Sequence, residues 1–408
     1  MPPLPLHRAP TGHAPLAASY VLPIAAATPQ LRALSGYLHR LGRMIDDVIV
    51  VDGSAPETFA VHAQAWSGIV RHMPPETRTT NGKVGGVMTG VTAAKHDAVI
   101  VADDDVRYRR AALGRMVAVL EDFSVVRPQN LFRPLPWHAR WDTARSLLSR
   151  LAGGDWPGTL GVRRSVLLDA GGYSGEVLFE NLELVRTIEA AGGRQIAPLD
   201  LFVERRPPPA RHFLSQRVRQ AYDEWARPAH FIAQLALVPF AISLIWLAGP
   251  IAAIALAAGA IAAAEAGRRT ARGRTAFPPT SALWAPAWLA ERAVTSWLAL
   301  ATRVLLGGVR YRTTRLAQAA TPLPVLKQRV RAAQTMAGAD CSQPPTRIDQ
   351  YVGSVCAAKP QPLRSAPAAR LINSSASLID HAPAPLTSAS ASQPIGTATG
   401  APSRARAE

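Results

Sequence analysis

Residues 97–108 read D-A-V-I-V-A-D-D-D-V-R-Y, an apolar run that ends in three consecutive carboxylates. A short Val- and Ile-rich run closed by acids predicts a buried strand that brings charge to the edge of a parallel sheet, where open α/β folds bind ligands. Two acids at positions i and i+2 can hold one hard divalent cation, which offsets the charge of a diphosphate. This pattern indicates nucleotide-sugar chemistry; the alternative is a cluster of acids that caps a turn or faces solvent.

The sequence before this segment alternates between strand and helix patterns, which predicts one half of a doubly wound nucleotide-binding fold. Strands are expected over Ala18–Ile24, Asp47–Val51 and Ala98–Val101, and helices over Pro29–Leu41, Thr58–Val70 and Val84–Ala94. The second strand ends in Asp52-Gly53-Ser54, so an acid and a glycine lie at a strand end. Beyond Arg127 the pattern is irregular, and Trp156 in that region is a candidate sugar platform or a core residue.

Two apolar segments, Phe231–Leu247 and Ile251–Ala264, contain no charged residue and are separated by Ala248-Gly249-Pro250. Together they exceed one membrane span, and Gly-Pro breaks a helix, so a hairpin of two membrane helices is expected. A helix pair in a soluble core is the alternative. By the positive-inside rule both flanks are cytoplasmic, because they carry Arg217, Arg219 and Arg227 before the hairpin and Arg268, Arg269, Arg272 and Arg274 after it.

The segment Trp284–Leu306 is also apolar but carries Glu291, Arg292 and Arg303, which suits an interfacial amphipathic helix or a third span. From about residue 335 the composition shifts to Ala, Pro, Ser and Thr, which predicts disorder. The expected organisation is a loose N-terminus over 1–17, a catalytic domain over 18–228, a membrane region over 229–310 and a mostly disordered tail over 311–408.

The formal net charge of +17 suits an anionic membrane surface or a nucleic acid. Nucleic-acid binding leaves the apolar 231–264 stretch unexplained, so no nucleic-acid partner is expected. Cys341 and Cys356 lie in the polar tail without metal-ligand spacing or a disulfide framework, so redox chemistry is not expected. The first residues lack the apolar core of a secretory signal, and the catalytic part is expected to stay in the cytoplasm.

Several motifs follow one another along the chain. They are V-I-V-V-D-G-S at Val48–Ser54, N-G-K-V-G-G-V-M-T-G-V-T-A-A at Asn81–Ala94, A-D-D-D-V at Ala102–Val106, a Gly-Gly-Tyr turn that closes Trp156–Tyr173, F-E-N-L-E-L-V-R from Phe179, and S-Q-R-V-R-Q-A-Y-D-E-W at Ser215–Trp225. In this order, with an apolar hairpin behind them, they resemble a membrane-associated, inverting family-2 glycosyltransferase over about residues 18–310. The resemblance implies the GT-A fold, a Rossmann-like α/β domain of nucleotide-diphospho-sugar transferases, followed by C-terminal membrane helices.

The resemblance implies a donor-binding role for Gln216 and donor-side roles for five residues of the nucleotide-binding half. Asp52 would accept hydrogen bonds from the donor base, and Lys83, at a helix start, would lie near the donor. Asp103 and Asp105 match the D-x-D motif, so they would contact the donor ribose and a divalent metal, Mg²⁺ or Mn²⁺. Asp104 is grouped with the donor-binding residues.

Two further motifs bear on the acceptor and the leaving group. Trp156 begins the segment that resembles the acceptor side. Gln216 and Arg219 match part of the family's Q-x-x-R-W motif, with Gln220 in place of the tryptophan. An arginine there would stabilise charge on the departing diphosphate. Arg217 and Arg227 are expected instead on a membrane-surface helix, facing lipid headgroups.

The catalytic base departs from the family pattern. Asn181 occupies the position where the family carries an aspartate as base, and an amide cannot take a proton from a hydroxyl near neutral pH. The base is then Glu180, Glu183 or another group, or the activity is reduced or lost.

The implied activity is transfer of a sugar from a nucleotide-sugar donor to a lipid, lipid-linked or glycan acceptor. The site would be the cytoplasmic face of the inner membrane, with the chain as a multi-pass protein in the bilayer. A catalytically impaired relative that serves as a membrane scaffold is the alternative, and Asn181 motivates it.

Overall fold

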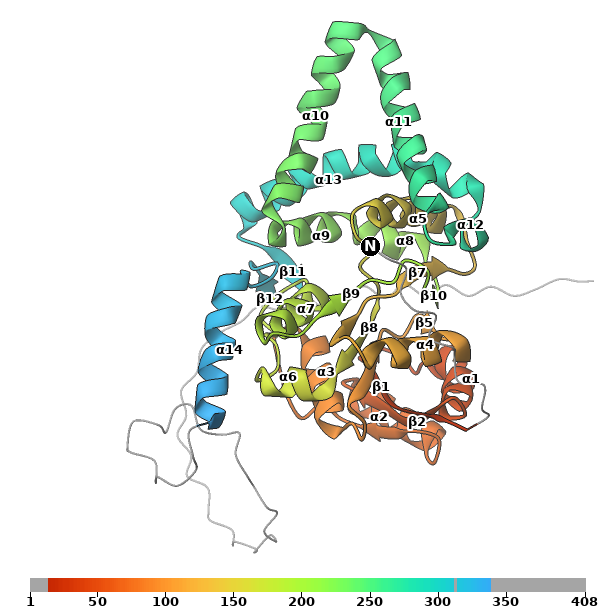
Figure 1. The fold of residues 1–408 in the computed structure, drawn as a ribbon, viewed down its shortest axis with the longest axis vertical. Helices are drawn as coiled ribbons and strands as arrows, with labels where there is room; N and C mark the ends of the chain where they lie inside the picture. Colours follow the sequence, from red (N-terminus) through yellow and green to blue (C-terminus); the bar gives the residue numbers. More distant parts are fainter. Residues whose placement is uncertain (1–13, 312–313, 339–408) are drawn as a thin grey trace, which may run out of the picture. The chain divides into compact units, whose positions relative to one another are not determined.

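The structure is a computed structural model that describes residues 14–311 and 314–338 (Figure 1). Its first elements are β1 (Leu16–Ile24), α1 (Leu31–Gly42), β2 (Ile45–Asp52), α2 (Pro56–Trp66), β3 (Arg71–Met73), α3 (Gly82–Ala93), β4 (Ala98–Ala102), β5 (Val106–Arg107) and α4 (Arg110–Leu120). They continue with β6 (Val125–Val126), β7 (Gln129–Phe132), α5 (Trp137–Leu151), β8 (Thr159–Arg163), α6 (Arg164–Asp169), α7 (Glu180–Ala190), β9 (Gln195–Ile196) and β10 (Phe202–Arg205).

The remaining described elements are mostly helical. They are α8 (Ala210–Ser215), α9 (Arg217–Tyr222), the 3-10 turn η1 (Asp223–Ala226), α10 (Pro228–Ala248), α11 (Pro250–Arg269), α12 (Gly273–Ala276), the 3-10 turn η2 (Pro279–Trp284), α13 (Ala285–Leu306), β11 (Val309–Tyr311), β12 (Thr314–Leu316) and α14 (Leu323–Gly338).

A seven-stranded sheet in the order β3-β2-β1-β4-β8-β6-β9 organises the N-terminal half. Strands β1 to β4 are parallel, and β8 runs antiparallel to both of its neighbours, β4 and β6. A smaller sheet joins β5, β10 and β7. Ile24 at the end of β1 pairs with Asp52 at the end of β2, so these two strands end at one edge. The predicted α/β fold with a parallel sheet is confirmed, and all six strands and helices predicted before residue 102 form.

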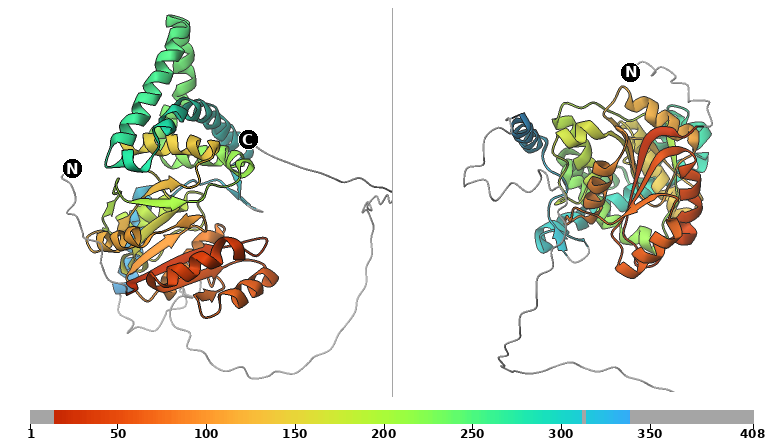
Figure 2. Two further views of the ribbon diagram at one scale, coloured as in Figure 1. Left: turned by 90° about the vertical axis from the view of Figure 1, so that its right-hand side faces the viewer. Right: turned by 90° about the horizontal axis from the view of Figure 1, so that it is seen from below.

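Helices cover both faces of this sheet (Figure 2). Successive residues of β1 point to opposite faces, so Tyr20 and Leu22 pack with α1 and α4, whereas Val21 packs with α3 and α7. Burial on both faces explains why β1 and β4 read as continuous apolar runs rather than as alternating ones.

The region beyond Arg127 is more regular than the sequence predicts, because it contains the 15-residue helix α5. The buried side of this helix includes His138, Asp142, Ser146 and Arg150. A helix that buries polar groups lacks the apolar periodicity by which helices are detected from sequence.

Helices α10 and α11 form the expected hairpin, which rises above α13 in Figure 1. They are long and apolar enough to cross a membrane, with mean hydropathies of 2.2 and 1.6. Only 6% and 22% of their most apolar windows are buried, so neither is a core helix of the described protein. The break falls at Gly249, whose φ of +67° favours glycine, and Pro250 starts the second helix.

Helix α13 passes the base of the hairpin and is not among the candidate spans of the described residues. One side buries Arg292, Ser296 and Ala299, while Val294, Trp297 and Leu298 are exposed on another. Ser296 Oγ donates to Gln234 Oε1 of α10 at 3.0 Å. Of the expected tail, 314–338 form β12 and α14, and 339–408, with both cysteines, lie outside the described residues.

We expect Gly267→Ala to destabilise the protein, because α11 crosses α5 at this glycine. A Cβ there would lie 1.9 Å from the carbonyl oxygen of Leu147, so the helices would have to separate. Such overpacking lowers the free energy of unfolding by about 1–3 kcal/mol, offset by up to ~1 kcal/mol of helix propensity. Thermal unfolding in detergent measures the effect against Gly259→Ala on the same helix, where a Cβ meets nothing within 4 Å. A Gly267→Ala protein as stable as the Gly259→Ala protein would contradict this close crossing.

Candidate active site

A cavity of about 850 Å³ lies at the carboxyl ends of β1 and β2, beside the N-terminus of α3. Three of the predicted donor-binding residues, Asp52, Lys83 and Asp104, line it. Its apolar lining includes Pro23, Pro56, Phe59, Pro74 and Pro75. The strand-end position and the helix N-terminus suit a nucleotide, because amides there point toward a bound phosphate.

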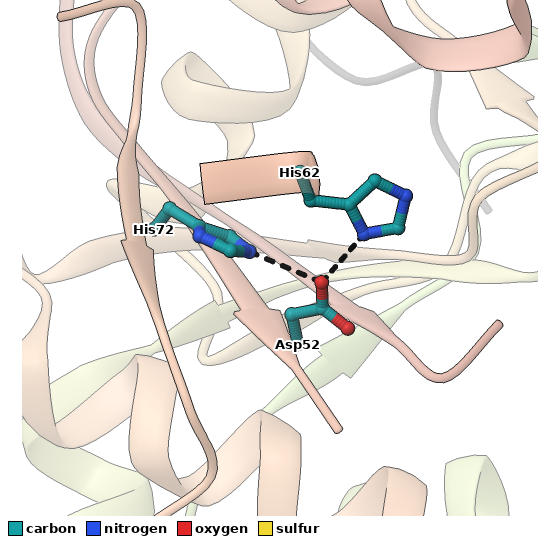
Figure 3. A group of neighbouring side chains, drawn as sticks. All are labelled: Asp52, His62 and His72. Carbon is teal, nitrogen blue, oxygen red and sulfur yellow. Dashed lines mark hydrogen bonds and ion pairs between the residues drawn. The ribbon is translucent and has the colours of Figure 1, made fainter. Parts of the chain in front are cut away.

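Asp52 is buried at the base of this cavity and held by three donors, of which Figure 3 shows His62 and His72. The backbone N–H of Ser54 donates to its Oδ1 at 2.9 Å, and His62 Nδ1 and His72 Nε2 lie 2.7 and 3.1 Å from its Oδ2. Burial alone would raise the pKa of Asp52, but hydrogen bonds from His72, Ser54 and His62 hold it well below its usual range. Asp52 is therefore a fixed negative charge.

The two histidines support Asp52 from neighbouring elements. His62 Nε2 accepts the backbone N–H of Gln30 at 2.8 Å, so its Nδ1 carries the proton that it donates to Asp52. The three ligand atoms lie within 4.8 Å of one another, a spacing that could hold a metal ion. The proton on His62 Nδ1 instead makes the trio a hydrogen-bonded unit. Neither histidine lies in a recognised motif, so the sequence did not indicate them.

Lys83 joins the ends of three elements. Its Nζ lies 2.6 Å from Asp103 Oδ1, just after β4, and 2.7 Å from Glu180 Oε1 at the start of α7. Burial alone would lower the pKa of Lys83, yet these two carboxylates raise it above its ordinary value. The ammonium therefore stays charged.

The three consecutive acids take different partners. Asp103 pairs with Lys83, whereas Asp105 binds the Arg205 guanidinium, with Oδ2 2.6 Å from Nη2. Arg205 Nη2 also lies 3.8 Å from Asp103 Oδ2. Asp104 lines the 850 Å³ cavity, and burial together with its two acidic neighbours raises its pKa. Carboxylate oxygens are the ligand type that Mg²⁺ and Mn²⁺ prefer, so Asp103 and Asp105 fit such an ion chemically.

A second cavity, of about 520 Å³, lies between the sheet edge and the helices below the hairpin. It brings together six predicted site residues, Asp103, Trp156, Glu180, Asn181, Gln216 and Arg219. Its other walls include α5, through Asp142 and Arg145, and α10 and α13, through His230, Gln234, Trp288 and Arg292. Lys83 lines the first cavity and contacts Asp103 and Glu180 of the second, so the two cavities meet at this ammonium.

The side chains around the second cavity are partly engaged with one another. The Arg127 guanidinium covers the Trp156 ring at 4.2 Å from its centroid. Arg219 Nη1 donates to Gln216 Oε1 at 3.3 Å, and its guanidinium lies 5.0 Å from the centre of the Tyr311 ring. Asn181 Nδ2 donates to the Pro157 carbonyl at 3.1 Å.

Two sequence expectations need correction. Glu183 is fully buried, lines neither cavity, and accepts the backbone N–H of Thr321 at 2.6 Å, so its position excludes direct contact with an acceptor. Arg217 does not face lipid headgroups, because it is 4% exposed and pairs with Glu291 at 2.5 Å. Buried pairing partners from distant segments are invisible to a local sequence pattern.

Asp223 also lines the second cavity, and the sequence did not indicate it. It follows the Gln216 to Arg219 motif by four residues, at the start of η1. The signal available was the Asp-Glu pair that precedes Trp225, which by itself is typical of any polar turn.

Residues 31–158 match the model of the family described as glycosyl transferase family 2. The chain therefore carries a family-2 glycosyltransferase domain, and it is an enzyme of the class that uses nucleotide-sugar donors. None of the curated proteins compared with the chain matches it.

Similar solved structures include the mannosyltransferase PcManGT from Pyrobaculum calidifontis in complex with GDP-Man and Mn²⁺, at 19% identity over 69% of this chain and 86% of that one, with a TM-score of 0.40. Glucosyl-3-phosphoglycerate synthase from Mycobacterium tuberculosis, with Mn²⁺, UDP and glucosyl-3-phosphoglycerate, is 20% identical over 48% and 74%, with a TM-score of 0.33. Residues 1–349 of S. aureus TarS with UDP-GlcNAc are 15% identical over 49% and 61%, with a TM-score of 0.34.

Proposed function

We propose that this chain transfers a sugar, with inversion, from a nucleotide-sugar donor to a lipid, lipid-linked or glycan acceptor at the cytoplasmic face of the inner membrane. The observation that carries the proposal is the meeting of two cavities at Lys83. One cavity has the strand-end position of a nucleotide site, and the other extends to the base of the apolar hairpin. Donor and acceptor would therefore approach one point from opposite sides.

The donor would occupy the 850 Å³ cavity. Asp52 would accept an N–H of the base through Oδ1, because its Oδ2 is taken by the two histidines. The N-terminus of α3 and the Lys83 ammonium would face the diphosphate, and both favour negative charge. Asp104, on the same cavity wall, would contact the ribose.

A divalent cation, Mg²⁺ or Mn²⁺, is proposed at the end of β4, held by Asp103 and Asp105. When bound, it supplies positive charge that stabilises the departing diphosphate. Asp105 gives both oxygens to Arg205, so cation and guanidinium would compete for this carboxylate.

The second cavity would hold the acceptor and stabilise the leaving group. Arg219, kept in place by Gln216, would bind the departing diphosphate. Trp156 offers a ring edge to the acceptor sugar, because Arg127 covers one face. The sequence makes Glu180 a candidate base, but its ion pair with Lys83 favours a role in orienting that ammonium.

The proposed domain limits separate the catalytic part of the chain from the membrane part. Residues 18–228 would form the catalytic domain and 229–310 the membrane region, with α10 and α11 inserted and α13 lying at the interface. The arginines at both ends of the hairpin support a cytoplasmic catalytic domain. The exposed apolar side of α13, at Val294, Trp297 and Leu298, would face the lipid.

The decisive experiment is donor turnover by the full-length protein purified in detergent, across a panel of nucleotide sugars with Mn²⁺ or Mg²⁺. We expect turnover of at least one donor, lost in EDTA and restored by the metal. Metal-dependent nucleotide binding without turnover of any donor would favour the scaffold alternative, which Asn181 motivates. Absence of nucleotide binding would contradict both the glycosyltransferase function and the scaffold alternative.

A further inference from the structure

Five carboxylates line the second cavity: Asp103, Glu180, Asp142, Glu224 and Asp223. The first two pair with Lys83, at 2.6 and 2.7 Å. Asp142 lies 3.0 Å from Arg145 Nε, and Glu224 lies 2.5 Å from Arg227 Nη2. A carboxylate held by a cation is a weak base, because the pairing favours its charged form.

Asp223 differs from the other four. Within residues 14–311 and 314–338 its carboxylate makes no hydrogen bond or ion pair, and Oδ1 of that carboxylate is buried without a partner. An unpartnered buried carboxylate oxygen costs free energy, and in native proteins such a group often has a catalytic role or binds a water or ion. A hydrogen-bond donor that enters the cavity would complete the bonding of this oxygen.

The surroundings of Asp223 suit proton transfer. Burial raises its pKa to about 8; the nearby Glu180 and Glu224 add to this shift, while Arg219 and Arg292 oppose it. General bases work best when their pKa lies near the operating pH. Asp223 lines the second cavity and not the first, so it lies on the acceptor side of Lys83, where the two cavities meet.

We propose that Asp223 is the catalytic base that removes the proton from the acceptor hydroxyl, the role that Asn181 cannot fill. This inference rests on the proposed function. The acceptor oxygen forms a bond to the anomeric carbon of the donor sugar. The bond from that carbon to the diphosphate breaks, and its electron pair leaves with the nucleoside diphosphate. The proton passes to the Asp223 carboxylate and then to water.

The same cavity wall indicates the class of acceptor. Next to Asp223, Glu224 Oε2 and the Nε and Nη1 atoms of Arg292 are also buried without partners among the described residues. This wall therefore offers both an unpaired hydrogen-bond acceptor and unpaired donors. Hydroxyl groups suit it, because each hydroxyl can donate one hydrogen bond and accept others. A phosphate acceptor would need no base, because it is already ionised near neutral pH. With Asp223 as the base, we therefore expect a sugar or polyol headgroup as the acceptor, entering from the side of α10 and α13.

The test compares wild type, Asp223→Asn and Asp223→Glu as full-length proteins in detergent, with the donor found in the panel and dodecyl glucoside as a hydroxyl acceptor. We expect Asp223→Asn to lower kcat at least about 100-fold and to lose the rise of kcat with pH near 8. Asp223→Glu should retain part of the activity. Binding of UDP and GDP with Mn²⁺ should stay within about twofold, because Asp223 does not line the donor cavity.

The matched control is Asp169→Asn, an exposed aspartate on α6 that lines neither cavity, and it should behave as wild type. Wild-type kcat and pH profile in Asp223→Asn would overturn the inference and leave the glycosyltransferase function standing. Loss of nucleotide binding in Asp223→Asn would assign the residue a structural role and also overturn it. Absence of turnover in the wild type would overturn the proposed function, and the inference with it.

Discussion

Lys83→Met is expected to lower sugar transfer by at least about 100-fold, the scale seen when one group that stabilises a developing charge is removed. Lys83 Nζ lies 2.6 Å from Asp103 and 2.7 Å from Glu180, where the two cavities meet. Without the ammonium, these carboxylates would repel each other and the donor diphosphate. The rate of transfer and the Kd of the nucleoside diphosphate measure the two consequences.

The stability of Lys83→Met should fall as well, and the conservative variant Lys83→Arg separates the effect on activity from the effect on stability. Lys83 is 21% exposed, so its removal should lower the free energy of unfolding by about 1–3 kcal/mol, less than the 3–5 kcal/mol of a fully buried pair. Lys83→Arg keeps the charge and should retain the stability with part of the activity. Full activity in Lys83→Met would contradict the assignment of this residue to the donor site.

Arg150→Met is expected to lower the free energy of unfolding by about 2–5 kcal/mol, because a buried carbonyl left without a donor costs about 1–3 kcal/mol and two part-buried carbonyls add smaller costs. Arg150 is 2% exposed and lies on α5. Its guanidinium donates to the carbonyls of Gly267 at 2.9 Å and Leu199 at 2.6 Å, and also to that of Thr270. It thus joins the end of α11 to the catalytic domain. Burial lowers its pKa to about 10, so it remains charged at neutral pH.

Unfolding of the detergent-solubilised protein, followed by tryptophan fluorescence, measures this loss. Arg140→Met on the same helix is the matched control, because Arg140 bonds to the exposed hydroxyl of Thr280 at 2.9 Å. Its effect should stay within about 0.5 kcal/mol. Equal stabilities of the two variants would show that α11 is anchored by other contacts.

The strands and the hairpin could be predicted because their signals are local. Strand β4 is buried on both faces, so it reads as one apolar run, and the acids that follow it must lie at a strand end. The long uncharged segments of α10 and α11, broken at Gly249-Pro250, similarly reflect an environment that is uniform along each helix. Helix α5 could not be predicted from the sequence, because its buried side is polar and the segments that it packs against lie far away along the chain.

Sequence alone thus determined the α/β class, the acidic strand end and the arginine-flanked hairpin, and it raised the question of the base through Asn181. The tertiary structure decided which charged partner each carboxylate contacts and how deeply each one is buried. Asp103 meets Lys83, whereas Asp105 meets Arg205, 100 residues away along the chain. Glu183 is buried and Asp223 lines the cavity, although both follow familiar motifs. The physical reason is that a carboxylate's role depends on its burial and on the charge opposite it, and both come from segments that only folding brings together.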